Sequence, residues 1–270
     1  MLLLCLLLSR TMVKDRMAPT TITNIENILF YECHSEKGEE GGGLYINLES
    51  AIINVTSCEF LRCWSSSYGG GFSIKAGKET TIKGSVGKEC TKYFNGDIPY
   101  GSFGILWTNG FVISTYVTEC EKNTQSSVCL HFNEARIPLS CCNFSSNYNI
   151  GGYGTMIYYN LCHLSSIKSC IIMGNTCDKL MRIMGCSGSL EVSDTMIVNN
   201  NYNNIPSATF TNCCIFNSKL PQNMISCITD RIIEMDDYKQ CKLGLGSSEF
   251  TQQRNHDSLL ILALYVLMLY

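Results

Sequence analysis

The residues with the most evident chemistry in this chain are its seventeen cysteines. Zinc sites usually pair cysteines at a C-x-x-C spacing, which occurs nowhere in the sequence; the spacing seen in Cys58 and Cys63 is C-x-x-x-x-C. We therefore expect neither a metal nor another cofactor. Two roles for the cysteines stay open, namely disulfides formed in an oxidising compartment and reduced thiols that pack as small buried hydrophobes.

Many of these cysteines belong to a phrase that recurs along the chain. Phe30-x-x-Cys33 precedes the triplet Gly41-Gly42-Gly43, and Phe60-x-x-Cys63 precedes Gly69-Gly70-Gly71. An apolar residue with Cys, Asn or Ser three places later returns at Val117, Phe144, Ile172, Met196 and Ile215, and a looser copy begins at Val86. The intervals vary around roughly 27 residues, whereas helical repeats keep stricter lengths.

Between these phrases lie short β-branched and aromatic runs, such as 51–55 and 154–159, separated by Gly, Asn and Ser. This punctuation is typical of strands, and the middle of the chain shows no sustained helical period. About three short strands per repeat predict an all-β fold, a right-handed parallel β-helix of about eight irregular coils with short apolar N- and C-terminal segments. Residues at equivalent positions would then stack about 4.8 Å apart.

Stacking predicts ladders of like side chains. One column would hold Cys33, Cys63, Cys90 and Cys120, and would continue as an asparagine ladder of Asn147, Asn175 and Asn199. Stacked amides hydrogen-bond one another, and Asn tolerates a left-handed corner. A second cysteine column would hold Cys58, Cys142, Cys170 and Cys213. The spacing of stacked coils falls within the roughly 4.4–6.8 Å between Cα atoms that a disulfide needs.

The pattern divides the chain into a signal peptide and lead-in (1–21), the β-helix (22–228), a cap (229–245), a polar stalk or anchor spacer (246–257) and an apolar membrane-anchor segment (258–270). Leu2 to Leu8 is typical of the apolar core of a secretory signal; the alternative is a true start upstream. The terminal run is shorter than the roughly 20 residues that cross a bilayer. Gly246, Ser247 and Ser248 before it favour a glycolipid-anchor attachment site, with a truncated membrane span or a buried end of the cap as alternatives.

Composition excludes two further classes of protein. Apolar residues make up 45% of the chain and charged residues 16%, which disfavours a disordered chain. The net charge of −3, with scattered Lys and Arg, leaves no basic stripe, so we expect no nucleic-acid partner. Two sequons, at Asn54 and Asn143, are candidate glycosylation sites on a secreted protein.

Catalytic patterns are weak. Glycosidases on a solenoid need clustered carboxylates, but Asp97, Asp178 and Asp194 fall at different phases of the repeat. The segment 185–189 resembles a nucleophile elbow without its closing Gly, and the four histidines fall at unrelated repeat positions. We therefore expect no catalytic residues. Trp64 and Tyr68 are expected to be exposed, and two interpretations stay open, a sugar or protein contact and incidental surface aromatics, of which the second is the more common.

The pairing of F-x-x-C with a Gly-Gly-Gly strand start, carried by 30–46 and 60–74 and more weakly by 144–157 and 172–175, resembles the polymorphic outer membrane protein repeat. The closest likeness is to the cysteine-rich, pectin-lyase-like β-helix surface proteins of parasitic protists. The resemblance implies a cell-surface or plasma-membrane protein, extracellular and held by its C-terminal segment.

The function that follows is noncatalytic adhesion to, or binding of, a host-cell protein, matrix component or glycan. The alternatives are a polysaccharide lyase or glycoside hydrolase on the same solenoid, and a degenerate fragment of a larger surface protein. If the tail is not an anchor, we expect the protein to be secreted.

Overall fold

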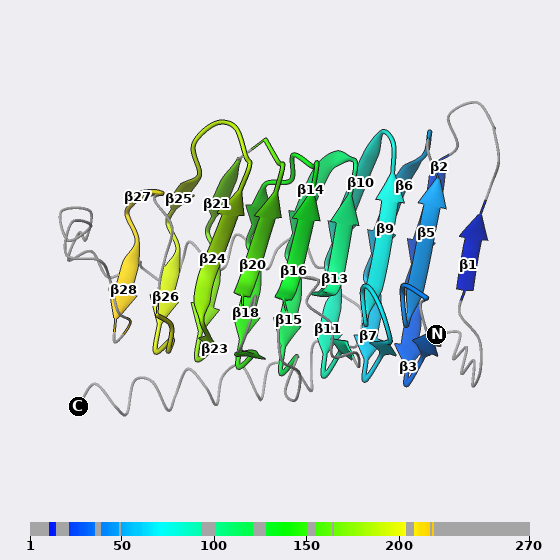
Figure 1. Cartoon of the computed structure of the whole chain (residues 1–270), viewed down its shortest axis with the longest axis horizontal. Coiled ribbons are helices and arrows are strands. Elements are labelled where there is room, and N and C mark those ends of the chain that lie inside the picture. Colours follow the sequence, from blue (N-terminus) through cyan, green and yellow to red (C-terminus); the bar gives the residue numbers. More distant parts are fainter. Residues whose placement is uncertain are drawn as a thin grey trace.

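A computed structural model describes residues 11–14, 22–35, 39–48, 50–92, 101–120, 128–150, 155–163, 165–203, 208–216 and 218. Every regular element in these ranges is a strand, and the strands pair in parallel from one coil to the next (Figure 1). The result is a parallel β-solenoid of about six turns, which confirms the predicted fold class. The seven strands of sheet A span six turns from first to last, and the last described coil adds strands only to the other two long sheets, so the count differs slightly from the eight coils expected.

Sheet A has seven strands, in the order β1, β5, β9, β13, β16, β20 and β24. Their bounds are β1 (Thr11–Lys14), β5 (Leu44–Leu48), β9 (Phe72–Ala76), β13 (Gly101–Leu106), β16 (Val128–Asn133), β20 (Thr155–Asn160) and β24 (Lys179–Met184). These strands form the row of long arrows across Figure 1. Sheet A thus has the longest strands of the three long sheets.

Sheets B and C have eight strands each, one of each sheet per coil. Sheet B contains β2 (Ile22–Glu26), β6 (Ile52–Thr56), β10 (Glu79–Lys83), β14 (Asn109–Ile113), β17 (Leu139–Ser140), β21 (Ser166–Lys168), β25 (Glu191–Ser193) and β27 (Thr209–Thr211). Sheet C contains β3 (Leu29–Tyr31), β7 (Glu59–Leu61), β11 (Val86–Lys88), β15 (Tyr116–Thr118), β18 (Asn143–Ser145), β22 (Ile171–Met173), β26 (Met196–Val198) and β28 (Cys214–Phe216).

Two short sheets extend the coils beyond sheet C. They consist of β4 (His34–Ser35), β8 (Trp64–Ser65) and β12 (Thr91–Lys92), and of β19 (Tyr148–Asn149) and β23 (Thr176–Cys177).

Alternation along each strand fills the interior. In β5, Leu44, Ile46 and Leu48 are buried, while Tyr45 and Asn47 face outward. Aromatic rings then stack between coils: the Phe30 and Phe60 rings are parallel, with centroids 4.8 Å apart. Because neighbouring coils are in register, each buried side chain meets its counterpart above and below. The core is therefore a set of stacks along the solenoid.

Two inward positions of sheet C differ from the sequence prediction by one residue. Gly87, rather than Val86, pairs with Phe60 and with Val117. Gly87 has no side chain to fill the interior at this position. The Phe103 ring of sheet A fills the space instead, since a Cβ added to Gly87 would lie 2.2 Å from Phe103 Cζ. Ile197, rather than Met196, pairs with Ile172 in the same row.

The corner after sheet C places one residue of each coil at positive φ. Examples are Glu32 (52°), Arg62 (54°), Glu119 (56°) and Asn199 (53°). Such angles are rare outside Gly and Asn. Hydrogen bonds to the backbone of the neighbouring coil stabilise these left-handed residues; for example, the Arg62 N–H donates to the Lys88 carbonyl at 2.9 Å. The left-handed residue therefore faces solvent, and the residue after it turns inward.

Candidate binding face

Cys33, Cys63, Cys90 and Cys120 each follow such a left-handed corner residue and stack along the solenoid. Their thiols reach back to the preceding coil: Cys63 Sγ donates to the Phe30 carbonyl at 3.3 Å, and Cys90 Sγ to the Phe60 carbonyl at 3.3 Å. The corresponding distance from Cys120 Sγ to the Gly87 carbonyl is 3.9 Å. In this column the thiols act as hydrogen-bond donors as well as apolar filling.

The asparagine ladder continues the same column and uses the same carbonyls. Asn147 Nδ2 donates to Val117 O at 3.0 Å, and Asn175 Nδ2 to Phe144 O at 2.9 Å. The third member is Asn200, whose Nδ2 donates to Ile172 O at 2.7 Å. The prediction of Asn199 was wrong by one residue, because Asn199 is the exposed left-handed residue of that corner. The tolerance of Asn for a left-handed backbone conformation therefore does not explain the ladder.

The second cysteine column lies two residues before the inward residue of sheet C. Cys58, Cys142, Cys170 and Cys213 all occupy this position and are buried. Ser85 and Thr195 share it on other coils: Ser85 Oγ accepts from Cys58 N–H, and Thr195 Oγ1 from Cys170 N–H. Hydroxyl residues thus interrupt the cysteines, and of the four only Cys142 and Cys170 lie on adjacent coils.

Twelve cysteines of the described residues carry free thiols, including every member of both columns. Cys141 is disulfide-bonded to a cysteine outside this set. In-register strands lie about 4.8 Å apart with their Cβ atoms pointing the same way, whereas a disulfide brings the Cβ atoms to about 3.8 Å. Burial raises the pKa of the column members Cys58, Cys90 and Cys170, whereas hydrogen bonds with neighbouring thiols lower the pKa of Cys63. Of the two roles left open by the sequence, the columns adopt the reduced one.

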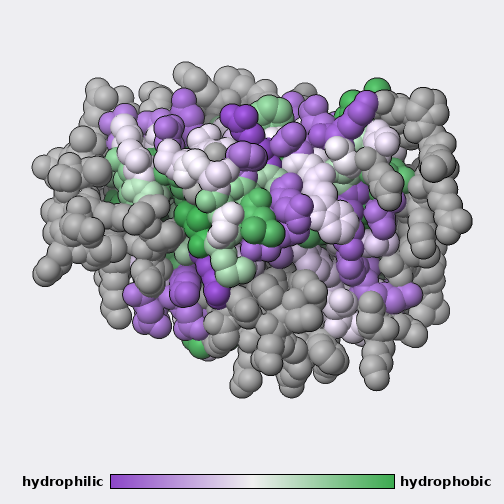
Figure 2. Space-filling model, turned by 45° about the horizontal axis from the view of Figure 1, so that its top comes forward, coloured by the Kyte–Doolittle hydropathy of each residue, from purple (hydrophilic) through white to green (hydrophobic). Residues whose placement is uncertain are grey.

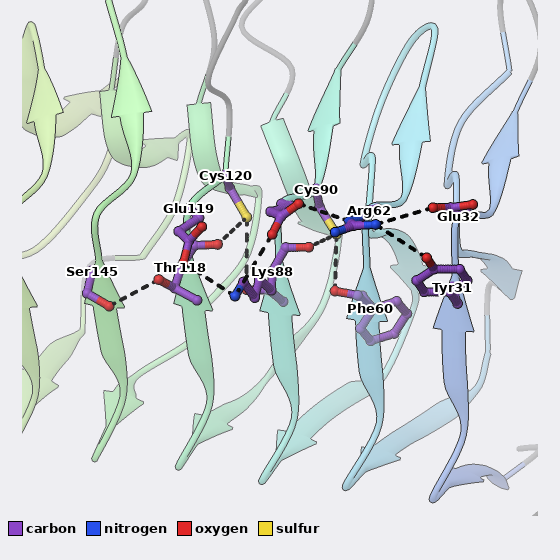
Figure 3. Close-up of polar contacts among 12 residues, drawn as sticks. Tyr31, Glu32, Phe60, Arg62, Lys88, Cys90, Thr118, Glu119, Cys120 and Ser145 are labelled. Atoms are coloured by element: carbon purple, nitrogen blue, oxygen red, sulfur yellow. Dashed lines mark hydrogen bonds and ion pairs between the residues drawn. The ribbon is translucent and has the colours of Figure 1, made fainter. Parts of the chain in front are cut away.

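The solvent side of the sheet C corner carries a ladder of opposite charges (Figure 3). The Arg62 guanidinium lies 3.5 Å from Glu32 and 3.0 Å from Glu89 on the neighbouring coils. One coil further, the Lys88 ammonium lies 3.4 Å from Glu119. Each cation is thus paired within the protein, and this corner has little charge left over for a ligand.

The two sequons lie on strands. Asn54, on the outer face of sheet B, is half-buried and donates through Nδ2 to Asn24 Oδ1 at 2.8 Å. Asn143 faces outward from sheet C beside the buried Phe144, and its Oδ1 is buried without a hydrogen-bond partner in the part of the chain described. Glycan attachment at either residue remains a prediction.

Other sequence predictions concern residues outside the described ranges, among them Gly246, Ser247 and Ser248 and the whole of segments 229–245, 246–257 and 258–270. No helix among the described residues is long and apolar enough to span a membrane. Within the same residues, no group of three or more His, Cys, Asp or Glu side chains is arranged to hold a metal ion.

The outer face of sheet A brings together aromatic and charged side chains that the sequence analysis did not identify. Lys75 Nζ lies 5.7 Å from the Tyr45 ring centroid and 5.5 Å from that of Trp107, and it forms a 2.7 Å ion pair with Glu40. Glu40 also accepts from Ser73 Oγ at 3.0 Å. Tyr45, Lys75 and Trp107 come from successive coils, and Trp107, which directly follows β13 at the corner after sheet A, is half exposed, at 50%. We call Tyr45, Lys75 and Trp107 the aromatic platform.

Further along the same face runs a stack of planar groups. The His131 ring stacks on Tyr68 with centroids 5.5 Å apart and on Tyr158 at 4.8 Å, and the Arg182 guanidinium lies 5.5 Å from the Tyr158 centroid. Tyr68 Oη hydrogen-bonds to His131 Nδ1. Tyr68 was expected to be exposed but is buried, because its ring covers Gly104, where a Cβ would lie 2.2 Å from Tyr68 Cε1. Trp64 is half-buried and stacks on His34.

Burial lowers the pKa of His131 to about 3, so its ring is neutral at physiological pH. Its Nε2 is buried and has no hydrogen-bond partner within the described residues. A sequence signal for this row existed: His131 and Tyr158 are polar or amphipathic residues set between buried apolar ones, which marks outward positions of a strand.

Comparison with known proteins gives no assignment, since no protein-family model matches the chain and a search of curated proteins finds no significant match.

Proposed function

We propose that this protein is a cell-surface β-helix that binds an external partner, a glycan by preference, through the outer face of sheet A. The observation that carries the proposal is the aromatic platform, in which Tyr45 and Trp107 flank an ammonium that Glu40 fixes. A ring face packs against the C–H face of a sugar, and neighbouring polar groups orient its hydroxyls. The platform combines both features on sheet A, whose strands are the longest.

Other parts of the surface support this choice by contrast. The charges of the sheet C corner satisfy one another, as Arg62 does with Glu32 and Glu89. On sheet A, half-buried polar side chains continue the platform: Asn160 Nδ2 donates to Asn133 Oδ1 at 2.6 Å, and Asn47 Nδ2 to Tyr45 Oη at 3.4 Å. Amides retain further donors and acceptors after one hydrogen bond, and can share them with sugar hydroxyls.

The chain has two tryptophans, so fluorescence can test the platform directly. Trp64→Phe leaves Trp107 as the only indole, and we expect oligosaccharides of at least one class (neutral hexose, N-acetylhexosamine or uronate) to change its emission saturably. In calorimetric titrations, Trp107→Ala should weaken binding of that sugar at least about tenfold, the equivalent of roughly 1.4 kcal/mol.

Phe111→Ala is the matched control, because Phe111 is exposed to a similar extent, 48%, but lies on sheet B. The Phe111→Ala variant should bind the same sugar as tightly as the unaltered protein does. A Trp107 emission that no sugar changes, or an equal loss in both alanine variants, would contradict a binding face on sheet A.

The proposed location is the extracellular face of the plasma membrane, with attachment through the apolar C-terminal segment. Its support is the sequence: the apolar run near the N-terminus, the small-residue site at 246–248 and the terminal run 258–270. Surface labelling of the native cell, with and without phosphatidylinositol-specific phospholipase, tests it. Release by the lipase is expected for a glycolipid anchor; retention of labelled protein would indicate a protein span, and unlabelled protein in the aqueous phase would contradict the location.

A further inference from the structure

The corner between sheets A and B brings together a serine and a histidine that the sequence analysis had treated as unrelated. His163 and Ser187 form an isolated parallel bridge, so they occupy the same position on adjacent coils. Ser187 Oγ lies 2.7 Å from His163 Nδ1, and both residues are exposed. This is the contact that a nucleophilic hydroxyl makes with its general base.

The backbone fixes this contact. Ser187 N–H donates to the Cys162 carbonyl at 3.0 Å, and the Cys186 thiol beside it points inward, accepting from Cys162 N–H at 3.2 Å. With Cys186 directed inward, Ser187 is directed outward. The serine also lies between two left-handed glycines, Gly185 (φ 62°) and Gly188 (φ 83°), so it stands on a tight turn.

Two neighbouring features suit an acyl substrate. Among the described residues, Gly188 N–H donates no hydrogen bond, and a free N–H directly after a nucleophile can stabilise an oxyanion. Leu161 and Met184, 55% and 43% exposed, precede the pair on the same two coils and are joined by the Leu161 N–H to Met184 O hydrogen bond. Figure 2, which turns the top of the solenoid forward, shows hydrophobic side chains gathered in the middle of the face in view.

We propose that Ser187 and His163 form an acyl-transfer pair that hydrolyses unhindered carboxylic esters, an activity beyond the proposed binding function and contrary to the expectation of a noncatalytic solenoid. Ser187 Oγ attacks the ester carbonyl while its proton passes to His163 Nδ1. The C–O bond to the alcohol breaks, and the alcohol oxygen takes that proton. Water then attacks the acyl-serine and gives its proton to His163, which returns it to Ser187 Oγ as the carboxylic acid leaves.

The first test is covalent. A fluorophosphonate probe should label the unaltered full-length protein, and peptide mass spectrometry should place the phosphonyl group on Ser187. Ser187→Ala should abolish the labelling, and His163→Gln should slow it. Ser189→Ala is the matched control, because Ser189 is an exposed serine two residues away and should not affect the labelling.

The second test is turnover of p-nitrophenyl butyrate. His163→Gln should lower the rate at least about 10²-fold, which is the lower end of the effect of a general base. Circular dichroism and the Trp107 sugar titration show that each variant is folded and separate this proposal from the binding one. Labelling of other serines, labelling that persists in Ser187→Ala, or equal turnover by His163→Gln and the unaltered protein would overturn the proposal.

Discussion

Asn175 shows how a single side chain joins three coils. Its Nδ2 donates to Phe144 O and to Asn200 Oδ1, and its Oδ1 accepts from the backbone N–H of Asn147. All of these groups are buried, so removing the amide leaves donors and acceptors that water does not reach. The ladder is therefore a row of polar groups that stabilises the stack only while every member is present.

We predict that Asn175→Ala lowers the free energy of unfolding by about 3 kcal/mol, since a buried unsatisfied group costs about 1–3 kcal/mol. Urea denaturation followed by circular dichroism measures the loss. Asn199→Ala is the control: Asn199 is an exposed neighbour of the ladder, and its replacement should cost no more than about 0.5 kcal/mol. Equal losses in the two variants would contradict the assignment of Asn200 to the ladder.

Cys120 marks the junction between thiols and amides and suggests a stabilising change. Its thiol makes the longest of the contacts described for this column, 3.9 Å to Gly87 O, and its N–H donates to Asn147 Oδ1. In the described part of the chain, Cys90 N–H has no acceptor. Cys120→Asn would extend the ladder by one coil and supply that acceptor, so we expect about 1 kcal/mol of added stability. A lower urea midpoint than that of the unaltered protein would contradict this expectation.

His131 makes stability depend on pH. Its pKa is lowered from 6.5 to about 3 by burial, so the unfolded chain binds a proton that the folded chain does not bind between these values. Stability from this group is fully present above pH 6.5 and is lost as the pH falls toward 3. Between pH 7 and pH 5 the loss is about 2 kcal/mol, from roughly 1.5 pH units at 1.36 kcal/mol each.

The matched variant is His131→Phe, which keeps a ring against Tyr158 but does not titrate. Unfolding free energies of both proteins at pH 5, 6, 7 and 8 test the prediction, because the contributions of other groups cancel in the difference. The free energy of unfolding of the unaltered protein, minus that of His131→Phe, should decrease steadily as the pH falls below 6.5. A difference that is constant with pH would show that the pKa of His131 is the same in the folded and the unfolded protein.

At the scale of the element, the sequence predicted which strands exist better than which residue of each points inward. The repeat of Phe30 and Phe60 identified sheet C, because both residues occupy the buried middle position of a three-residue strand. It failed at Gly87, where a strand of sheet A supplies the missing volume through Phe103, a contact no local pattern encodes. It failed at Asn199 because the left-handed angle belongs to the residue before the ladder.

The candidate sites were harder to predict than the fold for the same reason. His131 and Tyr68 meet across 63 residues, and His163 and Ser187 meet only when the coil between them has its actual length of 24 residues. Because the repeat length varies, a comparison of the sequence at one fixed spacing does not align the residues that lie opposite one another on adjacent coils. The cysteine columns were accessible because their members also share the local phrase with an inward residue.

Gly87 and Phe103 provide a test of packing between sheets. Phe103→Ala should cost about 3–5 kcal/mol through the cavity it leaves, and Gly87→Val about 1–3 kcal/mol through overpacking. The double variant should lose less than the sum, because the valine fills part of the cavity. Thermal unfolding of the four proteins gives the coupling energy, and strict additivity would show that Phe103 does not replace the missing side chain.

At the scale of the whole molecule, the register of the coils determines whether the thiols stay reduced or form disulfides. Parallel in-register stacking repeats each cysteine at a spacing that suits thiol-to-carbonyl hydrogen bonds better than disulfides, so burial rather than cross-linking protects the columns. The columns can therefore stay reduced in an oxidising compartment. This reconciles abundant free thiols with the extracellular location proposed above.

We predict that thiol-specific alkylation of the native protein modifies Cys33 and Cys186, which are half-buried, long before the other ten free cysteines, which are buried. Burial also raises the pKa of Cys90, which lowers its thiolate fraction at pH 8. Hydrogen bonds with the Cys33 and Cys90 thiols lower the pKa of Cys63, so the protection of Cys63 depends on its burial alone. Differential alkylation, first of the native and then of the denatured protein, followed by peptide mass spectrometry, reports each cysteine separately. Cys63 and Cys90 should appear only in the denatured fraction. Their early modification would mean that the coils open on the timescale of the reaction, and disulfides recovered among them would mean that the stacked register does not protect them from oxidation.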